Sequence, residues 1–293
     1  YYQLRSYIDL DETLRCCPGA GCERIATYSN DTCGEMADSD DLVAKCGTCD
    51  IEFCVKCGEE PHSPISCDML NRWIEKNTSD EHSCNYILVN TKPCPKCKRR
   101  IEKNGGCNHM SCRECNHQFC WLCMGNWAEH RTCNNYEVKG RAEKATYATA
   151  RLEFDKYMHY LPRYDGHGKG EKFAAKQIKE TNARIMSGNT LENGNFTVNE
   201  SRFLVNALRG LVECRRFLKL TYVLGYFADF DRVPLMKERF ECHQGTLEGF
   251  TEELSGHLEK PDLEMEIQQV INLTRTTETY MKNLVDYIDN EMI

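Results

Sequence analysis

The sequence predicts a multidomain protein in which two small cysteine-rich modules precede a mainly α-helical bundle. The chain has 20 cysteines among 293 residues, and all of them except Cys214 and Cys242 lie at or before Cys133. Many of the early cysteines form Cys-x-x-Cys pairs, which is the spacing of zinc-ribbon-like modules. Beyond residue 134 the apolar residues recur every three or four positions instead, which is typical of helices.

The Cys-x-x-Cys pairs predict four structural zinc ions. Structural zinc takes four Cys or His ligands in a tetrahedron, and each pair supplies two of them. A cysteine-rich chain could instead be a secreted disulfide protein, but repeated pairs completed by a histidine favour zinc in a reducing compartment. The expected ligand sets are Cys17, Cys22, Cys46 and Cys49; Cys54, Cys57, His62 and Cys67; Cys94, Cys97, Cys112 and Cys115; and Cys120, Cys123, His130 and Cys133.

The N-terminal part is expected to hold one zinc module between two simpler segments. Residues 1–16 have helical apolar spacing and predict a lead-in helix. Residues 17–67 form the first zinc module, in which Cys33 lies in an acidic loop and is expected to be a free thiol. Residues 68–93 have the polar composition of a linker, with a short helical segment around Trp73. The first module contains neither a Gly-Gly-Cys run nor a Cys-x-His pair, so a spacer or binding role suits it.

Residues 94–133 form the second zinc module, and one of its cysteines is left over. Cys107 follows two glycines and is followed two residues later by His109. The glycines leave room for a large electrophile, and a nearby histidine could stabilise the thiolate or remove a proton from an attacking amine. The local sequence leaves two interpretations open: Cys107 is a nucleophile, or it is a spare thiol.

Residues 134–293 are predicted to form a helical bundle. The isolated histidines there, including His159 and His167, are expected to be ordinary surface or packing residues. Helices are expected over Ala142–Leu161, from a Ser201 cap through Leu218, over Leu247–Leu258 and from Leu263 to Ile288, with breaks at 164–170 and 187–195.

The charge and composition of the chain limit the classes of binding partner and the cellular compartments that we expect. The net charge is −8 and the pI is about 5.7, which disfavours nucleic acid as the main partner. No stretch reads as a signal peptide, and the most apolar run is too short to span a bilayer. A cytoplasmic or nuclear protein is therefore expected. The chain begins without a methionine, which predicts a piece of a longer protein.

The motifs CPKC, IEKNGGCNHM and FCWLC, in this order of modules, resemble those of the RING-between-RING ubiquitin ligases, and more narrowly of the Ariadne subfamily. The resemblance covers nearly the whole chain. It implies an in-between-RING module at 17–67, a catalytic second RING-like module at 94–133 and an Ariadne-type autoinhibitory domain at 134–293. The first RING of that family is missing from the chain.

This resemblance implies a two-step transfer of ubiquitin. A ubiquitin-conjugating enzyme passes its ubiquitin to Cys107 as a thioester, and a lysine of a protein substrate then attacks it. His109 matches the histidine that acts as general base in the second step. A glutamate often stands where this chain has Gln118, which cannot act as an acid or base. The alternative is a non-catalytic, zinc-stabilised adaptor or binding module.

The resemblance also implies autoinhibition by the helical domain, which is released when a neddylated cullin–RING ligase binds. The stretch LEGFTEELSGHLE matches the segment that carries an inhibitory glutamate, here Glu252. Without the resemblance, Glu252 could equally be one carboxylate on a solvated helix face. A second inhibitory contact, a Phe-Glu pair, aligns loosely with Gly170–Glu171, so only Glu171 is carried over.

Overall fold

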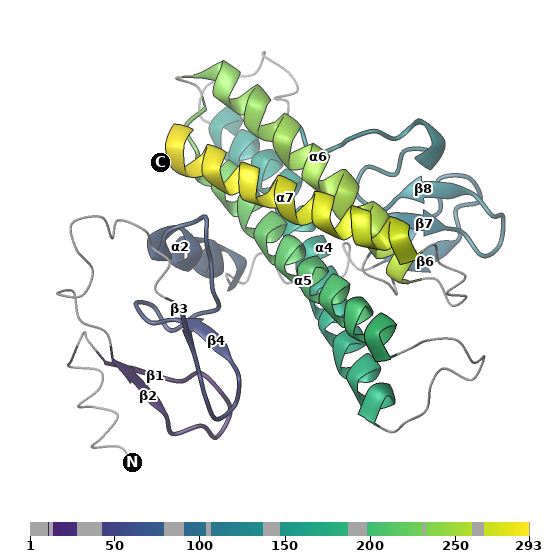
Figure 1. Ribbon diagram of the computed structural model, residues 1–293. Helices are drawn as coiled ribbons and strands as arrows, with labels where there is room; N and C mark the ends of the chain where they lie inside the picture. The colour runs from purple at the N-terminus through teal and green to yellow at the C-terminus, as the bar shows by residue number, and fades with distance from the viewer. Residues whose placement is uncertain are drawn as a thin grey trace. The chain divides into compact units, whose positions relative to one another are not determined.

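The computed structural model in Figure 1 describes residues 11, 14–27, 43–78, 91–103, 107–136, 147–186, 198–230, 233–259 and 267–292. The chain divides into two compact units, residues 1–77 and residues 78–293. Short antiparallel hairpins build the first unit and the beginning of the second, and long helices build the remainder. This confirms the predicted fold class. None of the described helices combines the length and the apolar character needed to cross a membrane.

Two hairpins and a helix make up the described part of the first unit. β1 (Leu14–Cys16) pairs with β2 (Ile25–Thr27), β3 (Val43–Lys45) pairs with β4 (Glu52–Cys54), and α2 (Cys67–Thr78) follows. The core of the hairpins consists of Phe53 and Val55 packed against ligand cysteines. So small a core supplies little stability to these hairpins, as expected of a module stabilised by bound metal ions.

The predicted lead-in helix is wrong where the structure describes it. Residues 14–16 form strand β1, because they are one arm of the first cysteine-bearing hairpin and pair with residues 25–27. The rest of the predicted helix, apart from Asp11, lies outside the described residues, as does Cys33.

The predicted linker is shorter than expected. Residues 68–78 belong to α2, whose Trp73 is completely buried, and residues 91–93 form strand β5. Residues 79–90 lie outside the described part of the chain.

The second zinc module repeats the hairpin arrangement. β5 (Thr91–Pro93) pairs with β6 (Arg100–Glu102), and β7 (His109–Ser111) pairs with β8 (Gln118–Cys120). A 3₁₀ turn, η3 (Trp127–Glu129), follows β8. Cys107 immediately precedes this second hairpin, and His109 is the first residue of its leading strand.

Five Cys-x-x-Cys turns in the two modules share one backbone geometry. The residue after the second cysteine donates its N–H to the carbonyl of the first cysteine, at 2.8–3.0 Å. That residue has a positive φ in every case, although only one of the five is a glycine: Asp50, Gly58, Lys98, Asn116 and Met124. A residue with a side chain adopts this conformation at a cost of roughly 1–2 kcal/mol. The turn is therefore imposed by its surroundings and not by residue preference.

Four long helices form the rest of the second unit as far as the structure describes it: α4 (Tyr147–Met186), α5 (Val198–Phe227), α6 (Pro234–Leu258) and α7 (Ile267–Glu291). α4 and α5 run side by side, and α6 and α7 pack with α5 (Figure 1). Leu208 and Leu211 of α5 meet Leu254 of α6 and Val270 of α7 in a shared core. The predicted apolar face of the last helix is buried at Val270, Thr274, Thr277, Leu284 and Ile288.

Two details of the predicted helices are wrong. The break at 164–170 does not occur, because α4 continues through that glycine-rich stretch. Gly166 is buried there, and a Cβ at that position would lie 3.7 Å from Asn108 Oδ1 of the second zinc module. Tertiary packing thus overrides the weak helix propensity of glycine. Ser201 is not a cap either, since α5 begins at Val198. The second predicted break lies outside the described residues.

Candidate functional site

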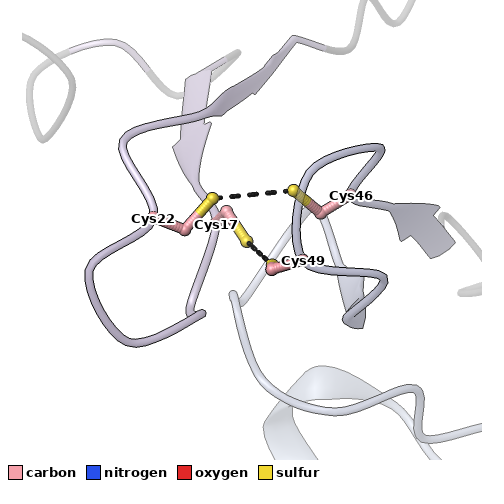
Figure 2. Close-up of side chains that lie close together, drawn as sticks. All are labelled: Cys17, Cys22, Cys46 and Cys49. Carbon is pink, nitrogen blue, oxygen red and sulfur yellow. Dashed lines mark hydrogen bonds between the residues drawn. The ribbon is translucent and has the colours of Figure 1, made fainter.

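The four predicted ligand sets are each brought together in the structure, with all ligand atoms of a set within 4.8 Å of one another. Figure 2 shows the first set, in which Cys22 faces Cys46 and Cys17 faces Cys49, with sulfur–sulfur distances of 3.6 and 3.4 Å. Four sulfurs about 2.3 Å from a tetrahedral zinc ion lie about 3.8 Å apart, whereas a disulfide requires about 2.05 Å. The sets therefore fit a metal ion and do not fit disulfides.

The other sets have the same dimensions. The sulfur–sulfur distances are 3.7 Å for Cys94–Cys115, 3.6 Å for Cys97–Cys112 and 4.0 Å for Cys120–Cys133. In the second set, His62 Nε2 lies 3.4 Å from the sulfur of Cys67, while its Nδ1 contacts the Ile65 carbonyl at 2.7 Å. Since a carbonyl only accepts, Nδ1 carries the proton and Nε2 is left free to bind a metal.

Cys107 belongs to none of the four sets. Its sulfur lies 3.3 Å from the backbone nitrogen of His109 and 3.9 Å from the backbone oxygen of Glu252 in α6. Cys107 and His109 both line a cavity of about 400 Å³, whose other walls include η3 and the Glu252 face of α6. A thiol outside the four metal-binding sets therefore lies where the second zinc module meets the helical bundle.

His109 is held by two neighbours in its own module. Its Nε2 lies 2.9 Å from Gln118 Oε1 on the adjacent strand. Because an amide oxygen accepts, Nε2 carries the proton in this arrangement and Nδ1 is the basic nitrogen of the neutral ring. The ring stacks on Trp127 at 4.3 Å between centroids, and Trp127 in turn stacks on His130 at 5.1 Å. His109 is thereby oriented by a hydrogen bond at its edge and an aromatic ring at its face.

Glu252 binds the residue next to Cys107. One of its carboxylate oxygens accepts the backbone N–H of Asn108 at 2.6 Å, and the other accepts the Asn108 side-chain amide at 2.9 Å. Arg215 of α5 donates to the second oxygen at 2.6 Å. Glu252 is only 7% exposed and Arg215 is completely buried. The carboxylate therefore lies at a buried contact between module and bundle, and not on a solvated helix face.

The charges at this contact perturb one another. Burial raises the pKa of the Cys107 thiol well above its usual range, and the charge of Glu252 raises it further. Burial would also raise the pKa of Glu252, but the charge and hydrogen bond of Arg215 outweigh it and lower that pKa to about 2. In this closed arrangement the thiol is protonated at neutral pH and Glu252 is ionised.

Glu171 is not brought to this contact. Its carboxylate accepts Arg216 Nε at 2.9 Å and Lys219 Nζ at 3.0 Å, which joins α4 to α5. The α4 residue that contacts Arg215 is instead His167, whose Nδ1 lies 3.4 Å from Arg215 Nη1. His167 is completely buried and its Nε2 lies 3.4 Å from Glu248. His167 was predicted to be an ordinary surface or packing residue, and no role was predicted for Arg215.

A second contact joins the end of the zinc module to the bundle. The side-chain nitrogen of Asn134 donates to the Glu241 carbonyl at 2.5 Å, and His159 Nε2 lies 2.8 Å from the Asn134 carbonyl. Arg163 of α4 donates to the carbonyl of the ligand Cys133. Gly245 permits this approach, since a Cβ there would lie 2.7 Å from Asn134 Oδ1. We call Cys133–Tyr136 the anchor segment.

Comparison with known proteins places three domains on the chain. An IBR domain, described as a half RING-finger domain, matches residues 1–67; a second IBR domain matches residues 89–135; and an Ariadne domain matches residues 155–293. E3 ubiquitin-protein ligase dbl4 of Schizosaccharomyces pombe is 35% identical over 268 residues, which cover 89% of this chain and 52% of the relative.

Two vertebrate proteins are similar over an even larger part of the chain. E3 ubiquitin-protein ligase arih1l of Danio rerio and E3 ubiquitin-protein ligase arih1 of Xenopus laevis are each 31% identical over 308 residues, which cover 97% of this chain and 55% of the relative. The chain thus spans about half the length of the curated relatives it matches.

Proposed function

The chain belongs to the Ariadne family of RING-between-RING proteins, and on that premise we propose that it is a ubiquitin transferase that works through a Cys107 thioester. Residues 17–67 are its in-between-RING module, residues 94–133 its catalytic module and residues 134–293 its autoinhibitory domain. Ubiquitin arrives from a conjugating enzyme and leaves on a lysine of a protein substrate.

The proposed chemistry has two acyl transfers. In the first, the Cys107 thiolate attacks the carbonyl carbon of the incoming thioester, and the thiolate of the conjugating enzyme leaves. In the second, a substrate amine attacks the Cys107 thioester, its proton passes to His109 Nδ1, and the Cys107 thiolate leaves. Gln118 orients His109 without taking part in proton transfer.

The single observation that supports this proposal best is the environment of Cys107. It is a thiol outside four complete metal-binding sets, and the residue beside it is hydrogen-bonded to Glu252 of the helical domain. A carboxylate next to a thiol keeps the thiol protonated and therefore unreactive. Autoinhibition by Glu252 follows, with Arg215 as the buried counter-ion that holds it ionised.

The four metal-binding sets are proposed to hold four zinc ions with a structural role. Each set has four protein ligands and leaves no open coordination position, so the ions brace the turns around Cys107 and His109 and do not react. The proposed partners are a charged ubiquitin-conjugating enzyme, ubiquitin, protein substrates and a neddylated cullin–RING ligase that releases the helical domain. The cytoplasm or nucleus is the proposed compartment.

The test uses the Glu252→Ala chain and ubiquitin activated as a C-terminal thioester of a small thiol. This donor needs no conjugating enzyme. A ubiquitin adduct that reductants cleave is expected on Cys107; Cys107→Ser should give an adduct that resists reductants, and Cys107→Ala none. Cys242→Ala, which removes an exposed cysteine of α6, is the matched control and should behave like its parent. An adduct that persists in Cys107→Ala would contradict the proposal.

One observation favours the alternative of a non-catalytic adaptor: the thiol is covered and its pKa is raised. The two functions predict different reactivities of Cys107 once the contact between Asn108 and Glu252 is broken. An adaptor would gain no reactivity toward the ubiquitin thioester when Glu252 is removed, whereas a transferase would.

A further inference from the structure

We propose that Asn108 forms an oxyanion-binding site for acyl transfer at Cys107, and that the Glu252 carboxylate occupies this site in the closed protein as a mimic of the tetrahedral intermediate. The inference rests on the proposed function, because it requires Cys107 to accept an acyl group. It adds a catalytic residue, Asn108, and a chemical reason why Glu252 inhibits.

Asn108 presents two hydrogen-bond donors to one carboxylate. Its backbone N–H lies 2.6 Å from one oxygen of Glu252, and its side-chain Nδ2 lies 2.9 Å from the other. When a nucleophile attacks a carbonyl, the oxygen becomes negative within bonding reach of the nucleophile. Backbone N–H groups and Asn side chains stabilise such oxyanions, and the N–H of the residue after the nucleophile is a recurrent donor. Asn108 is that residue for Cys107.

The orientation of Asn108 is fixed independently of Glu252. Lys103 Nζ donates to Asn108 Oδ1 at 2.8 Å, so the amide oxygen faces the lysine and Nδ2 faces the carboxylate. A lysine cannot accept and a carboxylate cannot donate, which excludes the flipped amide. The backbone is held by the N–H of Trp121, which donates to the Asn108 carbonyl at 2.8 Å. Asn108 is 3% exposed while α6 covers it, and its contacts with Lys103 and Trp121 lie within the second zinc module, so its donors stay oriented when Glu252 is removed.

These donors would act in both transfers. Attack by the Cys107 thiolate forms a carbon–sulfur bond and moves the carbonyl electron pair onto oxygen. The two donors of Asn108 stabilise that oxyanion until the pair returns and the carbon–sulfur bond to the donor thiol breaks. In the second transfer the amine forms the new bond, its proton goes to His109, and the bond to Cys107 breaks. Lys103 acts as a positioning residue through the Asn108 amide.

Two reactions of the same sulfur separate this role from a structural one. Acylation by the ubiquitin thioester passes through an oxyanion, whereas alkylation by iodoacetamide displaces iodide from a saturated carbon and forms none. Both rates are measured on Cys107 by mass spectrometry in the Glu252→Ala chain, which frees the Asn108 donors. The variants are Asn108→Ala, Lys103→Met and, as matched control, Asn135→Ala, which changes an exposed asparagine of the anchor segment.

Asn108→Ala should slow acylation about a hundredfold, which is the usual cost of losing one oxyanion donor, and leave alkylation unchanged. Lys103→Met should slow acylation less, again without changing alkylation, and Asn135→Ala should match its parent in both reactions. An Asn108→Ala chain that is acylated as fast as its parent overturns the proposal. So does an equal loss in both reactions, because that would mean only a displaced thiol. If the parent Glu252→Ala chain forms no adduct at all, the proposed function itself fails.

Discussion

Removing the Glu252 carboxylate should open the contact over Cys107 by an amount that the structure allows us to estimate. Two hydrogen bonds from Asn108 to an ionised carboxylate hold the second zinc module to α6. Hydrogen bonds to charged groups contribute about 1.5–3 kcal/mol each. Taking the lower value for both gives about 3 kcal/mol, which corresponds to roughly a hundredfold change in the open population.

The assay is the alkylation rate of Cys107 by iodoacetamide, followed by mass spectrometry of the peptide. Glu252→Ala should raise this rate on the order of a hundredfold if opening limits it. Glu253→Ala is the matched control, because Glu253 is the exposed neighbour that lines the same cavity. The pH profile should also move. Burial and then the charge of Glu252 raise the pKa of Cys107, so loss of that charge should shift the alkylation profile to lower pH.

Arg215 provides a second control in the same experiment. Glu252→Ala leaves a completely buried arginine without its carboxylate, and an unpaired buried charge typically costs about 3–5 kcal/mol of stability. The double variant Glu252→Ala/Arg215→Met should recover most of that stability and still show fast alkylation. If Glu252→Ala alkylates no faster than Glu253→Ala, the carboxylate does not hold the contact closed and the reasoning is refuted.

Three further predictions concern other parts of the site. Gly245→Ala should destabilise the protein by about 1–3 kcal/mol in thermal unfolding because of overpacking, since its Cβ would lie 2.7 Å from Asn134 Oδ1. The control Gly249→Ala meets nothing within 4 Å and should stabilise the protein by up to about 1 kcal/mol. Equal effects of the two substitutions would contradict this account of the anchor segment. Trp127→Ala should slow ubiquitin discharge to free lysine more than thioester formation, because it removes the ring on which His109 stacks. Trp127→Phe should restore part of the discharge rate. An equal loss in both steps would argue against a role of Trp127 through His109. Chelation of zinc should release four ions per chain and leave most of the helical circular-dichroism signal, since α4–α7 contain no ligand of any set. Loss of the helical signal on chelation would show that the bundle depends on the metal ions.

The sequence was most informative where neighbouring residues act together. Cys94 and Cys97 lie on one turn, so their spacing alone indicates a shared metal ion, and assigning the ligands of the second module in this way left Cys107 as its one unassigned cysteine. His109 and Gln118 are also close in sequence. The residues that sequence reasoning missed act across long separations: Arg215 reaches Glu252 over 37 positions, and Asn108 reaches Glu252 over 144.

The helical bundle shows why such residues are hard to predict. Arg215 lies among other charged residues of α5, between Glu213 and Arg216, so its sequence position gave no local signal of a buried ion pair. The glycines near 166 suggested a break because their intrinsic helix preference is weak, yet they are helical in a stretch where Gly166 packs against the second zinc module and Gly168 against Lys219 of α5. Glu171 was assigned by loose alignment alone, and it pairs with Arg216 and Lys219. Each miss involves partners that only the folded chain brings together.

The anchor segment has a consequence for how long an activating partner must stay bound. Cys133 is both a proposed zinc ligand and the start of the segment that α4 and α6 bind. Under the proposed autoinhibition, α6 is therefore held to the module at Glu241, on the same helix as the Glu252 that binds Asn108, and tethering through short connections produces local concentrations in the millimolar range. After any opening, recapture by α6 is an intramolecular event that competes with each arriving ubiquitin. An activator that touches the helices and departs would gain little, whereas one that remains bound through both acyl transfers would keep Cys107 available.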